Sequence, residues 1–144
     1  MIGVVEYDCS IYNTDGIDPD SLVDYRMTNE RKSIFGYPDA ECHRDNRVMF
    51  RECDVLIPAA TEKAINKHNA NDIKCRILVE AANGPTTKNA ESILLDKGIL
   101  IIPDVLANAG GVTVSYFEYL KNLDHVNPGL INRKWEETSK LRFL

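Results

Sequence analysis

Hydrophobic residues along the chain gather in short runs that polar turns separate. Four of these runs have the length and the apolar content of buried strands, at residues 1–5, 53–57, 77–80 and 99–102. Pro58 and Pro103 end the second and the fourth run. Because segments with helix signals follow the runs, the pattern predicts an α/β fold with a mostly parallel sheet and helices on both faces.

The predicted helices are identified mainly by their ends. Asp18 is a candidate N-cap with Pro19 in the first turn, and this helix should end near Glu30. A short helix is predicted over residues 61–69, while residues 31–51 show no clear period and should be irregular with short pieces of structure.

Two further helices are predicted beyond residue 85. One begins at Thr86 or Thr87 and reaches Lys97, with Gly98 in the left-handed position that often follows a helix. The other begins at Gly110 or Gly111 and carries Ser115, and residues 135–144 again show helix-like mixing of polar and apolar positions.

Composition narrows the function classes. The chain has 144 residues and a formal net charge of −5, so it is long enough for one domain with a core and offers no basic stripe for nucleic acid. Its apolar runs are far shorter than the ~20 residues of a membrane helix. The four cysteines form no C-x-x-C pair, and the three histidines lack metal-ligand spacing, so we expect free thiols, surface histidines and no metal site.

The strand-to-helix junctions hold the first candidate binding residues. Asn83 precedes Gly84 after the third run, and Asn108 leads into two consecutive glycines after the fourth. Open α/β sheets bind ligands beyond the carboxyl ends of their strands, where an amide side chain and free backbone N–H groups can meet a polar ligand. Asn-Gly alone is also a common turn, so Asn83 by itself is a weak signal.

Other candidates each have a structural alternative. Glu6 follows the first run and could accept ribose hydroxyls, but a solvated turn residue fits equally well. Ala59 and Ala60 would let a flat ligand approach the backbone, although a simple helix entry is favoured there. The Ser115 hydroxyl could bind a carboxylate, or it could bond to a carbonyl one turn earlier.

Taken together, several segments resemble the coenzyme-binding domain of glutamate dehydrogenases, most closely the animal type, within the glutamate, leucine, phenylalanine and valine dehydrogenase family. The resemblance covers residues 1–126 in family order. It is carried by Glu6 and by the segments DGIDPDSL, CDVLIPAATEKAIN, VEAANGPTT and IIPDVLANAGGVTVSYFEYLKNL.

The resemblance implies a Rossmann-like fold and assigns roles to matching residues. Glu6 is similar to the acid that binds the adenosine ribose, and Ala59 and Ala60 to residues lining the adenine and ribose side. Asn83 corresponds to a contact of the nicotinamide ribose. Asn108 resembles the residue that holds the carboxamide or the substrate, and Ser115 the hydroxyl that contacts the substrate's side-chain carboxylate.

The family implies oxidative deamination of L-glutamate to 2-oxoglutarate and ammonium with NAD or NADP. Glu6 favours the free ribose diol of NAD by repelling a 2′-phosphate, whereas animal-type enzymes resemble users of both coenzymes. The implied whole protein is a homo-hexamer of the mitochondrial matrix, although this chain shows no targeting segment.

Compared with the family pattern, this chain lacks the first strand, the glycine-rich loop and the substrate domain with its catalytic residues. Residues 1–126 are therefore expected to be a partial NAD(P)-binding domain, and residues 127–144 a helical extension. No catalytic residue is expected in this chain, which should be inactive alone. The alternative is a truncated or degenerate nucleotide-binding or interaction module without catalysis.

Overall fold

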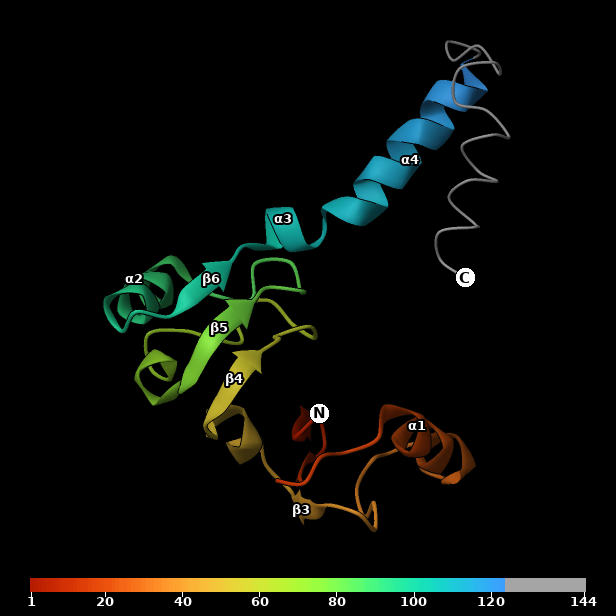
Figure 1. Cartoon of the computed structure of the whole chain (residues 1–144), viewed down its shortest axis with the longest axis vertical. Helices are drawn as coiled ribbons and strands as arrows, with labels where there is room; N and C mark the ends of the chain where they lie inside the picture. Colours follow the sequence, from red (N-terminus) through yellow and green to blue (C-terminus); the bar gives the residue numbers. More distant parts are fainter. Residues whose placement is uncertain (124–144) are drawn as a thin grey trace.

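A computed structural model describes residues 1–123 and contains two separate three-stranded sheets (Figure 1). The first sheet is antiparallel, in the order β1 (Gly3–Val5), β2 (Ser10–Tyr12), β3 (Glu41–His43). The second is parallel, in the order β4 (Cys53–Leu56), β5 (Cys75–Val79), β6 (Leu100–Ile102). The predicted extension at residues 127–144 lies outside the described residues.

The helices lie between and after these strands. The α-helices are α1 (Pro19–Thr28), α2 (Lys88–Asp96), α3 (Asp104–Ala107) and α4 (Ala109–Asn122), and the short 3₁₀ helices are η1 (Arg47–Phe50) and η2 (Ala70–Asp72). None of the helices described within residues 1–123 is long and apolar enough to cross a membrane. The parallel sheet and the helices that alternate with its strands confirm the α/β fold for the second half of the described chain.

The first predicted strand exists but belongs to the other sheet. β1 pairs antiparallel with β2 in the register Val4↔Ile11, and the Glu6 N–H donates to the Cys9 carbonyl at 2.9 Å in the turn between them. So short a turn can close a hairpin, whereas a parallel crossover needs a dozen or more residues. The expectation of a buried strand was also wrong, because Val5 remains 37% exposed.

The predicted helix over residues 61–69 does not form. Lys63 has a positive φ of 53°, and the Lys63 and Ile65 N–H groups donate to the carbonyls of Gly84 and Pro85. The Asn69 side chain accepts from the Asn66 N–H at 2.7 Å and donates to the Ala64 carbonyl at 2.9 Å. These long-range and side-chain bonds satisfy backbone groups that a helix would have paired locally, so tertiary contacts override the local propensity.

The other helix predictions are confirmed, with small shifts at the ends. The Asp18 carboxylate accepts from the Asp20 N–H at the start of α1, which ends at Thr28. Thr87 is the N-cap of α2 without a side-chain bond, and Gly98 follows the helix with a φ of 74°. In the region predicted to be irregular, β3 and η1 are the short pieces of structure.

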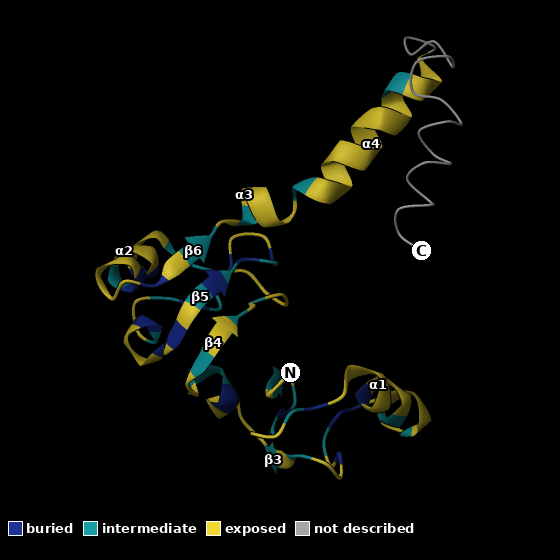
Figure 2. Cartoon of the chain, viewed as in Figure 1, coloured by how far each residue is buried: buried dark blue, intermediate teal, exposed yellow. Residues whose placement is uncertain are grey.

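The parallel sheet packs one face against α2. Leu78 of β5, the central strand of this sheet, is fully buried with Ala90 and Leu94 of α2. Val55, Ile77 and Leu100 are register partners one position away, so they lie on the opposite face, where Val55 is 46% and Leu100 60% exposed. Figure 2 shows the buried residues on the central strand and the exposed surface of α4.

Adjacent leucines on α2 provide a matched test of this core. We expect Leu94→Ala to lower the free energy of unfolding by about 2–5 kcal/mol, because it removes a fully buried side chain. Leu95→Ala, at a 55% exposed position of the same helix, should change it by less than about 0.5 kcal/mol. Urea unfolding followed by circular dichroism measures both, and equal effects would contradict the packing described for α2.

The buried thiol of Cys9 gives a second test. Burial, followed by the hydrogen bond to Asp8, raises the pKa of Cys9 to about 11, so its thiolate is scarce at pH 8. We expect a thiol reagent at pH 8 to spare Cys9 in the folded chain and to modify it after unfolding in urea. Titration with Ellman's reagent should therefore detect the same number of reactive thiols in the folded chain and in folded Cys9→Ala. Fewer reactive thiols in folded Cys9→Ala would show that the Cys9 thiol is accessible.

Candidate functional site

The three parallel strands all lead into junctions at one edge of the sheet. β4 is followed by residues 58–60, β5 by residues 80–84 and β6 by residues 103–108. The N–H groups of Ala81 and Ala82 both donate to the Pro58 carbonyl, at 3.1 and 2.9 Å. Parallel pairing and these bonds therefore place the first two junctions side by side.

Two acidic side chains connect the second junction to the third. The Glu80 carboxylate, whose residue is 9% exposed, accepts from the Asp104 N–H at 3.1 Å, and the Asp104 carboxylate accepts from the Gly84 N–H at 2.8 Å. Sequence reasoning missed both roles. The available signal was the position of each acid, directly after a strand or its closing proline, where a carboxylate can pair with free backbone donors.

The structure brings Ala59, Ala60, Asn83 and Asn108 to this edge, all of them exposed. Gly84 has a φ of 54°, which a glycine adopts without strain, and the turn it forms presents Asn83 to solvent. The Asn108 side-chain amide reaches the Ala82 carbonyl at 3.5 Å, a long hydrogen bond. We refer to these four residues as the junction cluster, whose amides and backbone groups are available to a polar ligand.

α4 begins at Ala109, directly after Asn108, and runs away from the sheet (Figure 1). Its N-cap makes no side-chain hydrogen bond, and a Cβ at Gly110 or Gly111 would meet only open space. The first-turn N–H groups are consequently open to a ligand. Ser115 is exposed on this helix. The back-bond considered for Ser115 is instead made by Thr113, whose hydroxyl donates to the Ala109 carbonyl at 2.8 Å.

Glu6 lies elsewhere, in the turn of the β1–β2 hairpin. Its carboxylate is 3.8 Å from the Arg26 guanidinium on α1, and within residues 1–123 no hydrogen bond or ion pair joins it to the junction cluster. Arg26 was not identified from the sequence. Its positive charge offsets the negative charge that a ligand beside Glu6 would meet, in a partly exposed ion pair that contributes little to stability.

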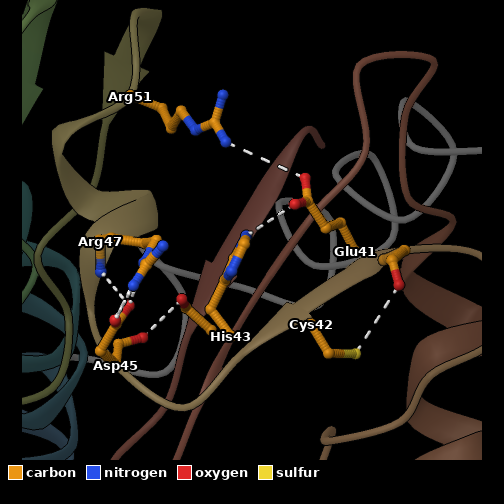
Figure 3. A network of polar contacts seen from close by, with 8 residues as sticks. Glu41, Cys42, His43, Asp45, Arg47 and Arg51 are labelled. Carbon is orange, nitrogen blue, oxygen red and sulfur yellow. Dashed lines mark hydrogen bonds and ion pairs between the residues drawn. The ribbon is translucent and has the colours of Figure 1, made fainter.

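A separate polar network links β3 to the segment before β4 (Figure 3). The Glu41 carboxylate lies 3.5 Å from His43 Nε2 and 3.9 Å from the Arg51 guanidinium, and Arg47 makes a forked contact with Asp45. The expectation of a surface histidine was wrong for His43, whose side chain is 13% exposed. No group of residues in the described part of the chain could hold a metal ion. We interpret the network as structural.

Comparison with known proteins matches residues 1–139 to the family described as Glutamate/Leucine/Phenylalanine/Valine dehydrogenase. The mitochondrial glutamate dehydrogenase of Dictyostelium discoideum is 48% identical over 97% of this chain and 28% of its own length. The glutamate dehydrogenase of Thermotoga maritima is 44% identical over 85% of this chain and 29% of its own length.

Solved structures give the same result. The hetero-hexameric glutamate dehydrogenase of Thermus thermophilus superposes with a TM-score of 0.74 at 28% identity, over 98% of this chain and 33% of that one. The chain thus spans less than a third of the length of the curated relatives it matches. The family match over most of the residues and the identity to these relatives establish that the chain belongs to the glutamate, leucine, phenylalanine and valine dehydrogenase family of oxidoreductases.

Proposed function

We propose that this chain is the coenzyme-binding part of an NAD(P)-dependent glutamate dehydrogenase, which converts L-glutamate to 2-oxoglutarate and ammonium. The observation that carries the proposal is the junction cluster, in which Asn83 and Asn108 lie exposed on neighbouring junctions of a parallel sheet. The names of the relatives support the reaction class. This chain alone should be inactive, because none of its described residues forms a catalytic constellation.

The residues at this edge fit a nicotinamide coenzyme. Asn83 makes no side-chain hydrogen bond within residues 1–123, so its amide can donate and accept toward a ribose hydroxyl. Asn108 has a long bond to Ala82 that a carboxamide could replace. Ala59 and Ala60 leave the backbone accessible to the flat adenine and ribose portion. Glu6, which lies outside this edge in the turn of the β1–β2 hairpin, would accept the hydroxyls of the adenosine ribose.

The bound coenzyme would supply hydride transfer, and this chain's residues would bind and orient the reactants. The open N–H groups at the start of α4 carry a partial positive charge that favours a substrate carboxylate. Ser115, further along the same helix, would donate its hydroxyl to the side-chain carboxylate of glutamate. These groups orient the substrate, and none of them is positioned here to exchange a proton with it.

We further propose that the whole protein assembles as a homo-hexamer and works in mitochondria. The Dictyostelium relative is named as mitochondrial, and the Thermus structure is titled a hetero-hexamer. A protein of family length would also supply the glycine-rich loop and the substrate domain that the coenzyme and glutamate require.

Coenzyme binding by the chain can be tested at Asn83. We expect NADH to shift the amide resonances of residues 81–84 and 108–111, and Asn83→Ala to weaken NADH binding by about 5–10-fold through loss of one or two hydrogen bonds. Binding of 5′-AMP should remain unchanged, because it lacks the nicotinamide ribose. Asn71→Ala removes an exposed amide on η2 and is the matched control. Equal weakening by both variants would overturn the role of Asn83.

Substrate binding can be tested at Ser115 in a protein of family length that carries these residues. We expect Ser115→Ala to raise KM for glutamate by about tenfold or more, since the lost bond is to a charged group, with little change in KM for the coenzyme. Ser92→Ala, on the exposed side of α2, should leave both constants unchanged. Unaltered glutamate kinetics in Ser115→Ala would instead favour a generic nucleotide-binding domain.

A further inference from the structure

Asn83 and Gly84 form the only Asn-Gly pair in the 144-residue sequence, and the pair lies in the segment between β5 and α2. In water, the peptide nitrogen of the residue that follows an asparagine can attack the asparagine side chain. This reaction is fastest before a glycine, which has no side chain to hinder the approach. Both residues of the pair are exposed. The pair is therefore a candidate for a spontaneous covalent change within the junction cluster.

The reaction consumes water and releases ammonia, with no oxidation or reduction. The Gly84 nitrogen forms a bond to Asn83 Cγ and loses its proton, while the bond from Cγ to Nδ2 breaks and Nδ2 takes up a proton to leave as ammonia. Water then opens the resulting succinimide ring. Addition of water at Cγ gives aspartate, and addition at the backbone carbonyl carbon of residue 83 gives isoaspartate, in which the chain continues through the side chain.

The side chain of Asn83 is free to meet the attacking nitrogen. It makes no hydrogen bond or ion pair within residues 1–123. Asn69 differs, because its side chain accepts from the Asn66 N–H at 2.7 Å and donates to the Ala64 carbonyl at 2.9 Å. A Cβ at Gly84 would meet nothing within 4 Å, so the space around the attacking residue is open. Asn83 thus combines an unrestrained side chain with an unhindered neighbour.

The attacking nitrogen, in contrast, is held in place. The Gly84 N–H donates to Asp104 Oδ2 at 2.8 Å, and the Gly84 carbonyl accepts from the Lys63 N–H at 2.9 Å. A hydrogen bond to a carboxylate is stronger than one to a neutral group. Because a carboxylate is too weak a base to remove a peptide proton, this bond restrains the nitrogen and does not activate it. The bond must open before the nitrogen can attack Asn83.

Asp104 is itself fixed by neighbouring groups. Its N–H donates to the Glu80 carboxylate at 3.1 Å, and its Oδ1 accepts from the Val105 N–H at 2.7 Å. The restraint on Gly84 therefore persists while the third junction stays against the second. Local opening of this loop, which needs less free energy than unfolding of the sheet, would release the Gly84 nitrogen.

We propose that Asn83–Gly84 is a self-modification site, and that Asp104 controls the rate at which Asn83 becomes aspartate or isoaspartate. The effect of this change on binding rests on the proposed function. Aspartate replaces the amide donor with a negative charge, and isoaspartate lengthens the backbone and displaces Gly84 from Asp104. Either product would weaken the contact that Asn83 makes with the nicotinamide ribose.

Incubation of the 144-residue chain at pH 8, followed by trypsin digestion and mass spectrometry, can test the proposal. Asn83 is the only amide side chain in the tryptic peptide 77–88, so its conversion is read directly. We expect the folded chain to convert Asn83 more slowly than the chain in urea. Folded Asp104→Ala should convert it about tenfold or more faster than the unchanged chain, because the bond to a charged group is lost.

Three further variants separate the groups involved. Asp104→Asn keeps a neutral acceptor, so its rate should lie between those of the unchanged chain and Asp104→Ala, and it tests the restraint if the alanine variant fails to fold. Asp96→Ala removes an exposed carboxylate at the far end of α2 and should leave the rate unchanged. Gly84→Ala, measured in urea, should slow the conversion by hindering the nitrogen. Unchanged rates in folded Asp104→Ala and Asp104→Asn, or faster conversion at another asparagine of the folded chain, would overturn the proposal.

The effect on coenzyme binding is measured separately. Anion exchange isolates the converted chain by its added negative charge, and we expect it to bind NADH about 5–10-fold more weakly than the unconverted chain, with 5′-AMP binding unchanged. Equal NADH affinity of the two forms would overturn this consequence. If the unconverted chain bound no NADH, the proposed function would fail, while the conversion rates would still decide whether Asn83–Gly84 is a modification site.

Discussion

Parallel pairing of β5 with both of its neighbours is the interaction on which the junction cluster depends. The registers Leu56↔Leu78 and Leu78↔Ile101 align the three strands so that their carboxyl ends meet at one edge. Fully buried Leu78 anchors this alignment against α2. A slip of one residue would turn every side chain to the other face, so burial of Leu78 also fixes which junction residues reach the edge. The bonds from Glu80 and Asp104 then hold the loops at that edge in place.

The antiparallel sheet forms separately from the parallel sheet and carries a different candidate binding residue. Its strands are joined by a short hairpin, and its core of Cys9, Ile11 and Ile34 is separate from the core beneath α2. Glu6 belongs to this half, whereas Asn83 and Asn108 belong to the parallel half. A dinucleotide has an adenosine end and a nicotinamide end, so the residues that bind it can come from both sheets. Under the proposed function, the adenosine ribose would meet Glu6, whose negative charge Arg26 offsets.

Prediction from the sequence succeeded where local signals and tertiary packing agree. Asp18–Pro19 and Gly98 mark the ends of α1 and α2 through capping chemistry that acts within a few residues, and the strand at residue 77 followed from its apolar run. Prediction failed where distant backbone groups decide the conformation. Residues 61–69 have the composition of a helix, yet their N–H groups bond to the segment around Pro85, and β1 pairs with β2, which has too few residues to be recognised by its period.

The difference between local signals and contacts of distant segments also explains which site residues could be predicted. Asn83 and Asn108 could be found because each follows a strand, and the position alone places them at the binding edge of a parallel sheet. Glu80 and Asp104 could not be assigned, because a carboxylate that binds a backbone N–H looks the same in sequence as a solvated one. Arg31 and Arg44 are thirteen positions apart, and they line one polar cavity with Asp8 only in the folded chain. The charge of that cavity is therefore a property of the tertiary structure.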